Sequence, residues 1–250
     1  MLGLGVGFYK LGGSRYIFGC EDLRDATDAA APTAVNLSLW LQNDTEVTVS
    51  RWTDQSGNNN HATQDTAENQ ATVVNGGLDF ERGESDHYDL ANNTIITDDQ
   101  GFCLIAVLEL ESTGDNPILS DTNNEMIKLA GSAGSRIRIN LNDPSNETCD
   151  LDVASGTFPK DQKFLLMINR SAGSDGSCTY EVFKNGTAVA HSGGQNSTSN
   201  HGFSFDTIGS RAGADQFLDG KILELAFWSR QLTTQEVADV NDYLKTIHGL

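Results

Sequence analysis

Residues 217–248 read FLDGKILELAFWSRQLTTQEVADVNDYLKTIH, and this stretch decides the fold. Its first half predicts a strand over residues 222–228, because Leu223, Leu225 and Phe227 recur with a period of two. The alternation places these three side chains on one fully buried face. The other face carries Ile222, Glu224, Ala226 and Trp228. A strand of this kind needs further strands beside it.

The second half of the stretch predicts a helix. Thr233 stands at the N-cap position, and Glu236 three residues later completes a capping box. Leu232 and Val237 are spaced to form a hydrophobic staple, and Gly249 marks the end. One apolar stripe at helical spacing contains Val237, Val240, Tyr243, Leu244 and Ile247. A helix with a single apolar stripe must pack on something, and the rest of the chain offers only sheet.

From residue 36 onward, apolar segments alternate with turns rich in Asn, Asp, Gly and Ser. Residues 101–110 are apolar on both faces, which is typical of a central strand. Asn185 and Gly186 predict a type I′ hairpin turn. Shorter strands are predicted at residues 37–41, 47–52, 118–119, 126–129, 137–141, 164–168 and 203–205, and residues 75–90 are predicted to form two short strands around a turn. We therefore expect an all-β, two-sheet antiparallel sandwich with one C-terminal α-helix.

Composition narrows the function classes. The chain has 250 residues, a formal net charge of −19 and a sequence pI near 4.4, which disfavour binding to nucleic acid and to anionic membranes. No apolar run reaches the 18 residues of a membrane span, and no secretory signal is predicted at the start. Carboxylates clustered in loops would suit a hard cation, so calcium is the candidate ion, with solubility in a salty medium as the simpler interpretation.

Residues 1–34 differ from the remainder. Leu2, Leu4, Val6 and Phe8 alternate with glycines, so an extended ribbon would present one bulky face and one bare face. We interpret 1–34 as an N-terminal arm that attaches the domain of residues 35–250 to other proteins in an oligomeric assembly. A simple edge strand is the alternative.

Several motifs resemble those of a known family. The segments are WTDQSGNNNHATQ at 52–64, NGGLDF at 75–80, IGSR at 208–211 and the terminal strand and helix. In this order they are similar to the laminin-G-like branch of the concanavalin A-like lectin/glucanase superfamily. The resemblance implies a jelly-roll sandwich that serves as a binding or adhesion module, often with calcium or a glycan at its rim. The opening MLGLGVGFYKLGG is similar to arms of marine phage virion proteins.

The loop after Trp52 is the candidate binding site. Side-chain oxygens there would hold calcium, with Asp54 as the candidate ligand, or would bind a sugar stacked on Trp52. The alternative is local: Asp54 forms an Asx turn, Gly57 supplies a positive φ, and the polar side chains hold the loop together. The candidate ligand-binding residues are Trp52, Asp54, Asn58, Asn60 and His61.

A catalytic role is not expected. A retaining glycosidase needs two carboxyl groups about 5–5.5 Å apart. Glu109 and Glu111 share a strand face but adjoin a turn, and Glu224 has no acidic neighbour at 222 or 226. Solvated or capped carboxylates explain all three. The five histidines show no metal-ligand spacing, so zinc is not predicted.

The cysteines show no metal spacing either. Cys103 lies in an apolar run and is expected to be a buried free thiol. Cys149 and Cys178 stand in neighbouring segments, but whether they pair is left open by the sequence. Together these features predict a non-catalytic structural or adhesion protein of a phage virion or similar surface. The alternatives are a calcium-dependent lectin, secreted or on a cell surface, and a glycan hydrolase of the same fold.

Overall fold

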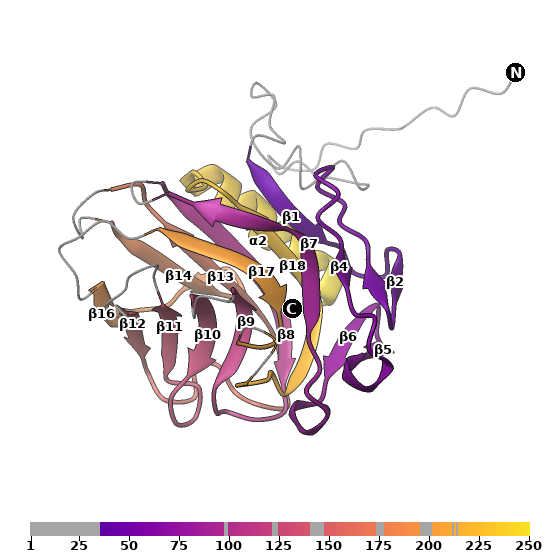
Figure 1. Ribbon diagram of the computed structural model, residues 1–250. Coiled ribbons are helices and arrows are strands. Elements are labelled where there is room, and N and C mark those ends of the chain that lie inside the picture. The colour runs from indigo at the N-terminus through magenta and orange to yellow at the C-terminus, as the bar shows by residue number, and fades with distance from the viewer. Residues whose placement is uncertain are drawn as a thin grey trace, which may run out of the picture.

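The computed structural model describes residues 36–97, 100–121, 125–140, 148–173, 178–195, 202–211, 213 and 215–250. Two antiparallel sheets lie face to face, and one α-helix covers the far side of one of them (Figure 1). The predicted all-β sandwich with a C-terminal helix is thus confirmed. The N-terminal arm, including Leu2, Leu4, Val6 and Phe8, lies outside the described residues.

The sheet under the helix, called the helix-side sheet, has eight described strands. They are β15 (Thr187–Ala188), β14 (Tyr180–Lys184), β13 (Lys163–Arg170), β8 (Phe102–Leu110), β18 (Gly220–Trp228), β6 (Gly77–Phe80) and β5 (Thr72–Val74), with β1 (Leu37–Leu41) also paired to β18.

The opposite sheet, called the outer sheet, has ten described strands. They are β16 (His191–Gln195), β12 (Thr148–Val153), β11 (Arg136–Asn140), β10 (Met126–Ala130), β9 (Asn116–Ser120), β17 (Phe203–Ile208), β7 (Tyr88–Ile96), β4 (Ala62–Thr63), β3 (Arg51–Trp52) and β2 (Val47–Thr48). Short 3₁₀ helices span Ala67–Asn69 and Arg82–Glu84.

Strand β8 is covered on both faces, by the outer sheet on one side and by the helix on the other. Its Leu104 and Leu108 point into the core between the sheets, whereas Ile105 and Val107 point to the helix. All four are at most 1% exposed. The central position predicted for residues 101–110 is confirmed, because β8 pairs with β13 on one side and β18 on the other. Burial on both faces explains the unbroken apolar run.

Strand β18 corrects the predicted alternation. Leu223 lies in the cluster under the helix, while Leu225 and Phe227 lie between the sheets. The pairing with β8 shifts between Ile222 and Glu224, so Leu223 is an extra, bulged residue. The bulge occurs where the other edge of β18 changes partner from β6 to β1. A bulge moves a side chain to the opposite face, so the prediction for Leu223 was wrong.

Helix α2 (Thr234–His248) follows the predicted signals closely. The Thr233 hydroxyl accepts from the Glu236 N–H, the Glu236 carboxylate accepts from the Thr233 N–H, and Gly249 closes the helix in a left-handed conformation. Val237, Val240 and Leu244 are buried against the helix-side sheet. Ile247 is an exception, since it is 49% exposed, and the last turn instead buries His248.

Two hairpins lie in segments for which the sequence made a prediction. Asn185 and Gly186 have φ values of 49° and 75°, which confirms the I′ turn between β14 and β15. Residues 47–52, predicted as one run, are two short paired strands, because the chain turns between Thr48 and Arg51. Strands β4, β5, β12 and β16 were not predicted, since they are short or rich in polar residues.

Candidate functional site

The loop after β3 covers the free edge of β1. Asp54 Oδ1 accepts from the Trp40 N–H at 2.9 Å, and the Gln55 N–H donates to the Trp40 carbonyl at 2.7 Å. The Asn58 amide donates to the Leu37 carbonyl at 2.6 Å. Side chains and one backbone amide therefore take the place of a further strand, and they close an edge that would otherwise be open to another chain.

Asp54 is fully engaged in this arrangement. Besides the Trp40 N–H, its carboxylate accepts from the N–H and hydroxyl of Ser56, at 2.8 and 2.7 Å, and from the Asn60 N–H at 2.9 Å. These four donors satisfy both oxygens of a carboxylate that is 6% exposed. The geometry thus supports the local, loop-forming interpretation of Asp54.

Of the other predicted binding residues, Trp52 and Asn60 are buried, and all those described below hydrogen-bond within the fold. Trp52 is 1% exposed, and its indole N–H donates to the Gln42 carbonyl, so its ring is not open to a sugar. His61 Nδ1 accepts from the Asp54 N–H at 3.1 Å. Asn60 is buried and its Oδ1 accepts from the Asn92 N–H at 2.7 Å, which ties the loop to β7. Tyr88 is buried between the sheets, and Trp40 and Trp228 are buried under the helix, so none of these rings is open to a sugar.

Asn58 and Asn60 open onto a cavity of about 570 Å³ where the edges of the two sheets meet. That volume is within the usual range for small-molecule sites. One wall comes from the start of β1, a second from the loop and a third from β7. The lining residues are Asn36, Leu37, Ser38, Asn58, Asn60, Asn92, Thr94, Ile95 and Ser229.

None of the described residues that line this cavity is charged, although the protein has a net charge of −19. Asn36, Asn58 and Asn92 are exposed. Among the described residues, Asn58 Oδ1 receives no hydrogen bond, and the side-chain amide of Asn92 makes none. Ile95 adds an apolar surface that is 65% exposed. The cavity therefore offers neutral donors and acceptors beside one aliphatic side chain.

Calcium does not fit the predicted ligand. The lone pairs of Asp54 are used by four protein donors, and cation binding would displace them. Across the described ranges, no three His, Cys, Asp or Glu side chains lie in a geometry that holds a metal ion.

The carboxylates considered for catalysis have other partners. Lys221 Nζ lies 3.0 Å from Glu109 Oε1 and 3.2 Å from Glu111 Oε1. This ion pairing raises the pKa of Lys221 to about 12, with the Glu109 hydrogen bond as the largest cause. Both glutamates are therefore occupied by one lysine on the neighbouring strand.

Glu224 requires a correction, because it is neither solvated nor without a partner. It is 2% exposed, and its two oxygens contact Trp40 Nε1 at 2.9 Å and His248 Nε2 at 2.7 Å. Glu224 shares the strand face of Ala226 and Trp228, which points to the helix, and there the last turn of α2 supplies the histidine. A buried carboxylate between two donors is part of the packing of α2.

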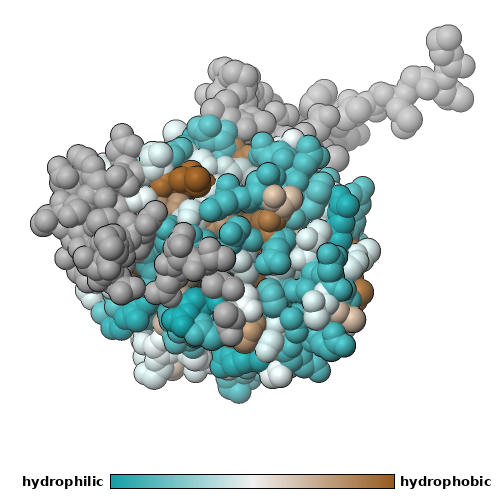
Figure 2. Space-filling view, in the orientation of Figure 1, coloured by the Kyte–Doolittle hydropathy of each residue, from teal (hydrophilic) through white to brown (hydrophobic). Residues whose placement is uncertain are grey.

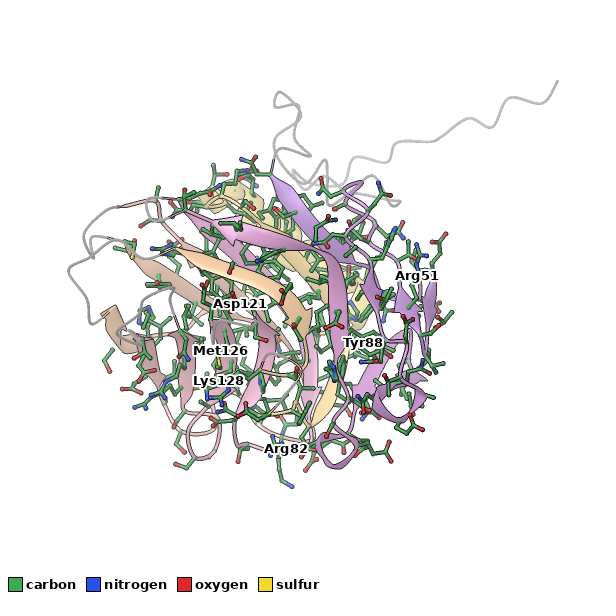
Figure 3. The ribbon with its side chains drawn as sticks, viewed as in Figure 1. Arg51, Arg82, Tyr88, Asp121, Met126 and Lys128 are labelled. Carbon is green, nitrogen blue, oxygen red and sulfur yellow. The ribbon has the colours of Figure 1, made fainter. Side chains whose placement is uncertain are left out.

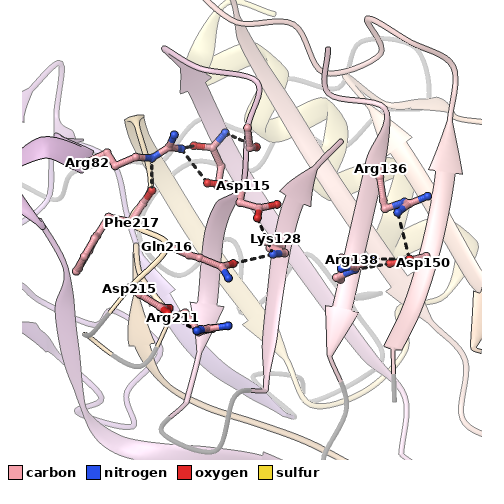
Figure 4. A network of polar contacts seen from close by, with 12 residues as sticks. Arg82, Asp115, Lys128, Arg136, Arg138, Asp150, Arg211, Asp215, Gln216 and Phe217 are labelled. Carbon is pink, nitrogen blue, oxygen red and sulfur yellow. Dashed lines mark hydrogen bonds and ion pairs between the residues drawn. The ribbon is translucent and has the colours of Figure 1, made fainter. Parts of the chain in front are cut away.

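Sequence reasoning missed a polar network along the outer sheet. Lys128 is 4% exposed, and its Nζ lies 2.7 Å from Gln216 Oε1 and 3.2 Å from Asp115 Oδ2 (Figure 4). Arg138 binds both oxygens of Asp150 at 2.7 Å. The sequence pattern that could have predicted this network is the alternation of charged residues over 136–140 and 148–152. Opposite charges on two paired strands stabilise each other.

A second missed group lies higher on the same face, where Asp121, Met126 and Lys128 follow one another (Figure 3). Glu125 is 1% exposed, with Oε2 accepting from the Ser204 N–H and Oε1 buried without a partner. Burial, and then the nearby Asp121, raise the pKa of Glu125 to about 7. The sequence DTNNE at 121–125 was the signal, two acids at the ends of a turn between apolar strands.

These features define a two-sheet, lectin-like sandwich with a neutral cavity at its rim. The chain belongs to the concanavalin A-like lectin/glucanases superfamily, whose family model matches residues 82–238. The resemblance in the motifs is thereby confirmed at the level of the superfamily. No curated protein matches the chain. No described helix is long and apolar enough to cross a membrane.

Solved structures show the same fold at low identity. The binding domain of Paraclostridial Mosquitocidal Protein 1 is 16% identical with a TM-score of 0.55, over 84% of this chain and 52% of that chain. The Botulinum neurotoxin type G receptor binding domain is 15% identical with a TM-score of 0.51, over 84% and 51%. Trypanosoma rangeli sialidase in complex with the inhibitor DANA is 16% identical with a TM-score of 0.51, over 82% and 32%. The chain thus spans about half or a third of these structures.

Proposed function

We propose that this protein is a non-catalytic carbohydrate-binding module that binds neutral glycans in the cavity between β1, the loop of residues 55–61 and β7. The observation that carries the proposal is the set of uncharged amide and hydroxyl groups around that cavity. Superfamily membership supports carbohydrate as the ligand class, and two similar structures are titled as binding domains.

The chemistry of the cavity favours a hydroxyl-rich, uncharged ligand. Asparagine amides both donate and accept, so they match sugar hydroxyls, which do the same. A sugar also has an apolar C–H face, for which Ile95 is an exposed partner. An acidic glycan would meet no cation among the described lining residues and would approach a protein with a strongly negative charge.

The absence of a catalytic role is also part of the proposal. Its support is that Glu109 and Glu111 are ion-paired with Lys221, whereas Glu224 is buried beneath the helix. Ligands bound by this module should be recovered unchanged. Release of reducing sugar from a neutral polysaccharide at a rate above that of a heat-denatured sample would contradict this part.

The proposal is tested with a glycan array, followed by calorimetry on the best neutral oligosaccharide. We expect Asn92→Ala to weaken binding about 3- to 10-fold, since one or two hydrogen bonds are lost. Asn93→Ala is the matched control, because Asn93 is the next, exposed residue of the same strand and does not line the cavity. Chelator should change nothing. Preference for acidic glycans, or equal losses in both variants, would overturn the assignment.

Attachment to a virion or comparable assembly through residues 1–34 is the finer part of the proposal, with secretion or a cell surface as the alternative location. Its support is the alternation of Leu2, Leu4, Val6 and Phe8 with glycine. Deleting 1–34 should abolish recruitment to the assembly and leave glycan affinity unchanged. Unchanged recruitment would exclude the attachment role.

A further inference from the structure

The cavity between β1, the loop of residues 55–61 and β7 contains two side-chain amides whose orientation is fixed by the protein. The first is that of Asn58, whose Nδ2 donates to the Leu37 carbonyl at 2.6 Å and to the Ser56 hydroxyl oxygen at 2.9 Å. Both amide hydrogens are therefore used. A flipped amide would bring Oδ1 against the Leu37 carbonyl, and two acceptors repel each other. The side chain of Asn58 thus offers the cavity a hydrogen-bond acceptor and no donor.

The second fixed amide, that of Asn60, offers a donor instead. Its Oδ1 accepts from the Asn92 N–H at 2.7 Å, and its Nδ2 has Thr94 Oγ1 as its one described partner, at 3.4 Å. A flip would place the amide hydrogens against the Asn92 N–H. Because Asn60 is 2% exposed, a buried and rigid side chain supplies one unused donor hydrogen at the cavity wall.

The same cavity has an aliphatic surface. Ile95 lines it and is 65% exposed. Ser38 and Ser229 line it as well, but their hydroxyl groups bond to each other. A ligand therefore meets one fixed acceptor, one fixed donor and one exposed aliphatic side chain.

We infer that the cavity prefers neutral sugars that carry an acetamido group, such as N-acetylhexosamines. This inference rests on the proposed function, since it names the class of glycan that the same cavity binds. An acetamido N–H can only donate and its carbonyl can only accept, so they match Asn58 Oδ1 and Asn60 Nδ2, and its methyl group packs on Ile95. A hydroxyl group at the same position of the sugar would have to reach both amides from one oxygen atom, and it brings no methyl group.

The experiment compares neutral sugars that differ in this one group. The full-length protein is titrated, with NMR detection, with the methyl glycosides of N-acetylglucosamine, glucose, N-acetylgalactosamine and galactose. In at least one of the two pairs, we expect the acetamido sugar to bind about 10-fold more tightly than its hydroxyl counterpart, because it adds a methyl contact and a matched hydrogen bond.

A substitution at Ile95 tests the role of the methyl group. Ile95→Ala should lower the preference for the acetamido sugar about threefold, because part of an aliphatic contact is lost. Val49→Ala is the matched control, since Val49 is also an exposed aliphatic residue but does not line the cavity. This control should leave the affinities for both members of the pair unchanged.

The outcomes separate this inference from the proposed function. If both members of each pair bind equally and Asn92→Ala weakens both, the cavity binds neutral glycans without the preference, and only the inference is wrong. If no neutral glycan binds, or if Asn92→Ala leaves binding unchanged, both are wrong. Nε-acetyl-lysine carries the same group without a sugar ring, and equally tight binding of this probe would assign the cavity to acetylated peptides and overturn both.

Discussion

Asp54 and Glu125 are both buried carboxylates, and they differ in what surrounds them. Asp54 is 6% exposed and accepts four hydrogen bonds within one loop and its neighbouring strand. Glu125 is 1% exposed, accepts from the Ser204 N–H, and leaves Oε1 buried without a partner beside Asp121. The difference shows that the number of donors, more than burial, decides whether a buried charge stabilises the fold.

The two positions also differ in what the carboxylate holds together. Asp54 joins β1 to the loop that lines the cavity, so its charge is used to close a sheet edge. Glu125 directly precedes β10 of the outer sheet, whose visible face is mostly hydrophilic with small, separate apolar patches (Figure 2). Removing the carboxylate charge should therefore lower the stability of the fold at Asp54 and raise it at Glu125.

The largest expected effect is at Asp54. Asp54→Ala leaves the N–H groups of Trp40 and Asn60 buried without an acceptor, and each such group costs about 1–3 kcal/mol. We expect a loss of about 3–5 kcal/mol in the free energy of unfolding, measured by urea denaturation. Glycan affinity should fall as well, because Asn60 loses its acceptor and Asn58 is held through Ser56, whose hydroxyl also donates to Asp54.

Asp65→Ala is the matched control for this experiment. Asp65 is exposed and lies just beyond the same loop, so its removal should change stability by less than about 0.5 kcal/mol. A loss below about 1 kcal/mol in Asp54→Ala would show that the loop closes the β1 edge without the carboxylate. In that case the number of hydrogen-bond donors would not explain the difference between Asp54 and Glu125.

Glu125→Gln should increase the stability of the fold at high pH, whereas Asp54→Ala should decrease it. The pKa of Glu125 is about 7 in the folded protein and 4.5 as its ordinary value, so the folded state binds more protons between these values. Stability contributed by this group is therefore present at low pH and lost as pH rises from about 4.5 to about 7. We expect Glu125→Gln to be more stable than the wild type at pH 8, by up to about 3 kcal/mol.

The pH profile carries this test. The gap between Glu125→Gln and the wild type should close as pH falls below about 4.5, and Glu68→Gln, at an exposed position, should show no such pH-dependent gap. If Glu125→Gln is less stable than the wild type at pH 8, the unpartnered oxygen has a donor in solution, and Glu125 resembles Asp54 after all.

The sequence predicted the elements whose partners are local. The Thr233 and Glu236 capping box depends on two residues three positions apart, and the Asn185–Gly186 turn on two adjacent φ angles. Both are set by the chain itself, so spacing alone was sufficient. The apolar run over β8 was similarly reliable, since burial on both faces leaves a continuous signal.

Features that depend on distant strands were not predictable in this way. The bulge at Leu223 arises because β6 and β1 share one edge of β18, which no local pattern records. For the candidate site, two of the predicted ligand-binding residues, Asn58 and Asn60, line the cavity. The contribution of β7, through Asn92 and Thr94, was missed because these residues are some thirty positions away along the chain.

Glu236 is a third buried carboxylate, and its substitution should have the smallest effect on stability of the three. Burial alone would raise its pKa, but two hydrogen bonds from Arg230 at 2.8 Å and one from the Thr233 N–H lower it. The sign is therefore opposite to that of Glu125: the stabilisation is present above pH 4.5 and is lost as pH falls through the lowered pKa. Glu236→Gln should lose about 1 kcal/mol at pH 7, measured by urea denaturation, and this loss should shrink as the pH is lowered below 4.5. Asp242→Asn, at an exposed position of the same helix, is the control and should change stability by less than about 0.5 kcal/mol. A Glu236→Gln variant as stable as the wild type at pH 7 would mean that the neutral amide serves the cap equally well, and that a charged donor adds nothing to a buried carboxylate at a helix N-terminus.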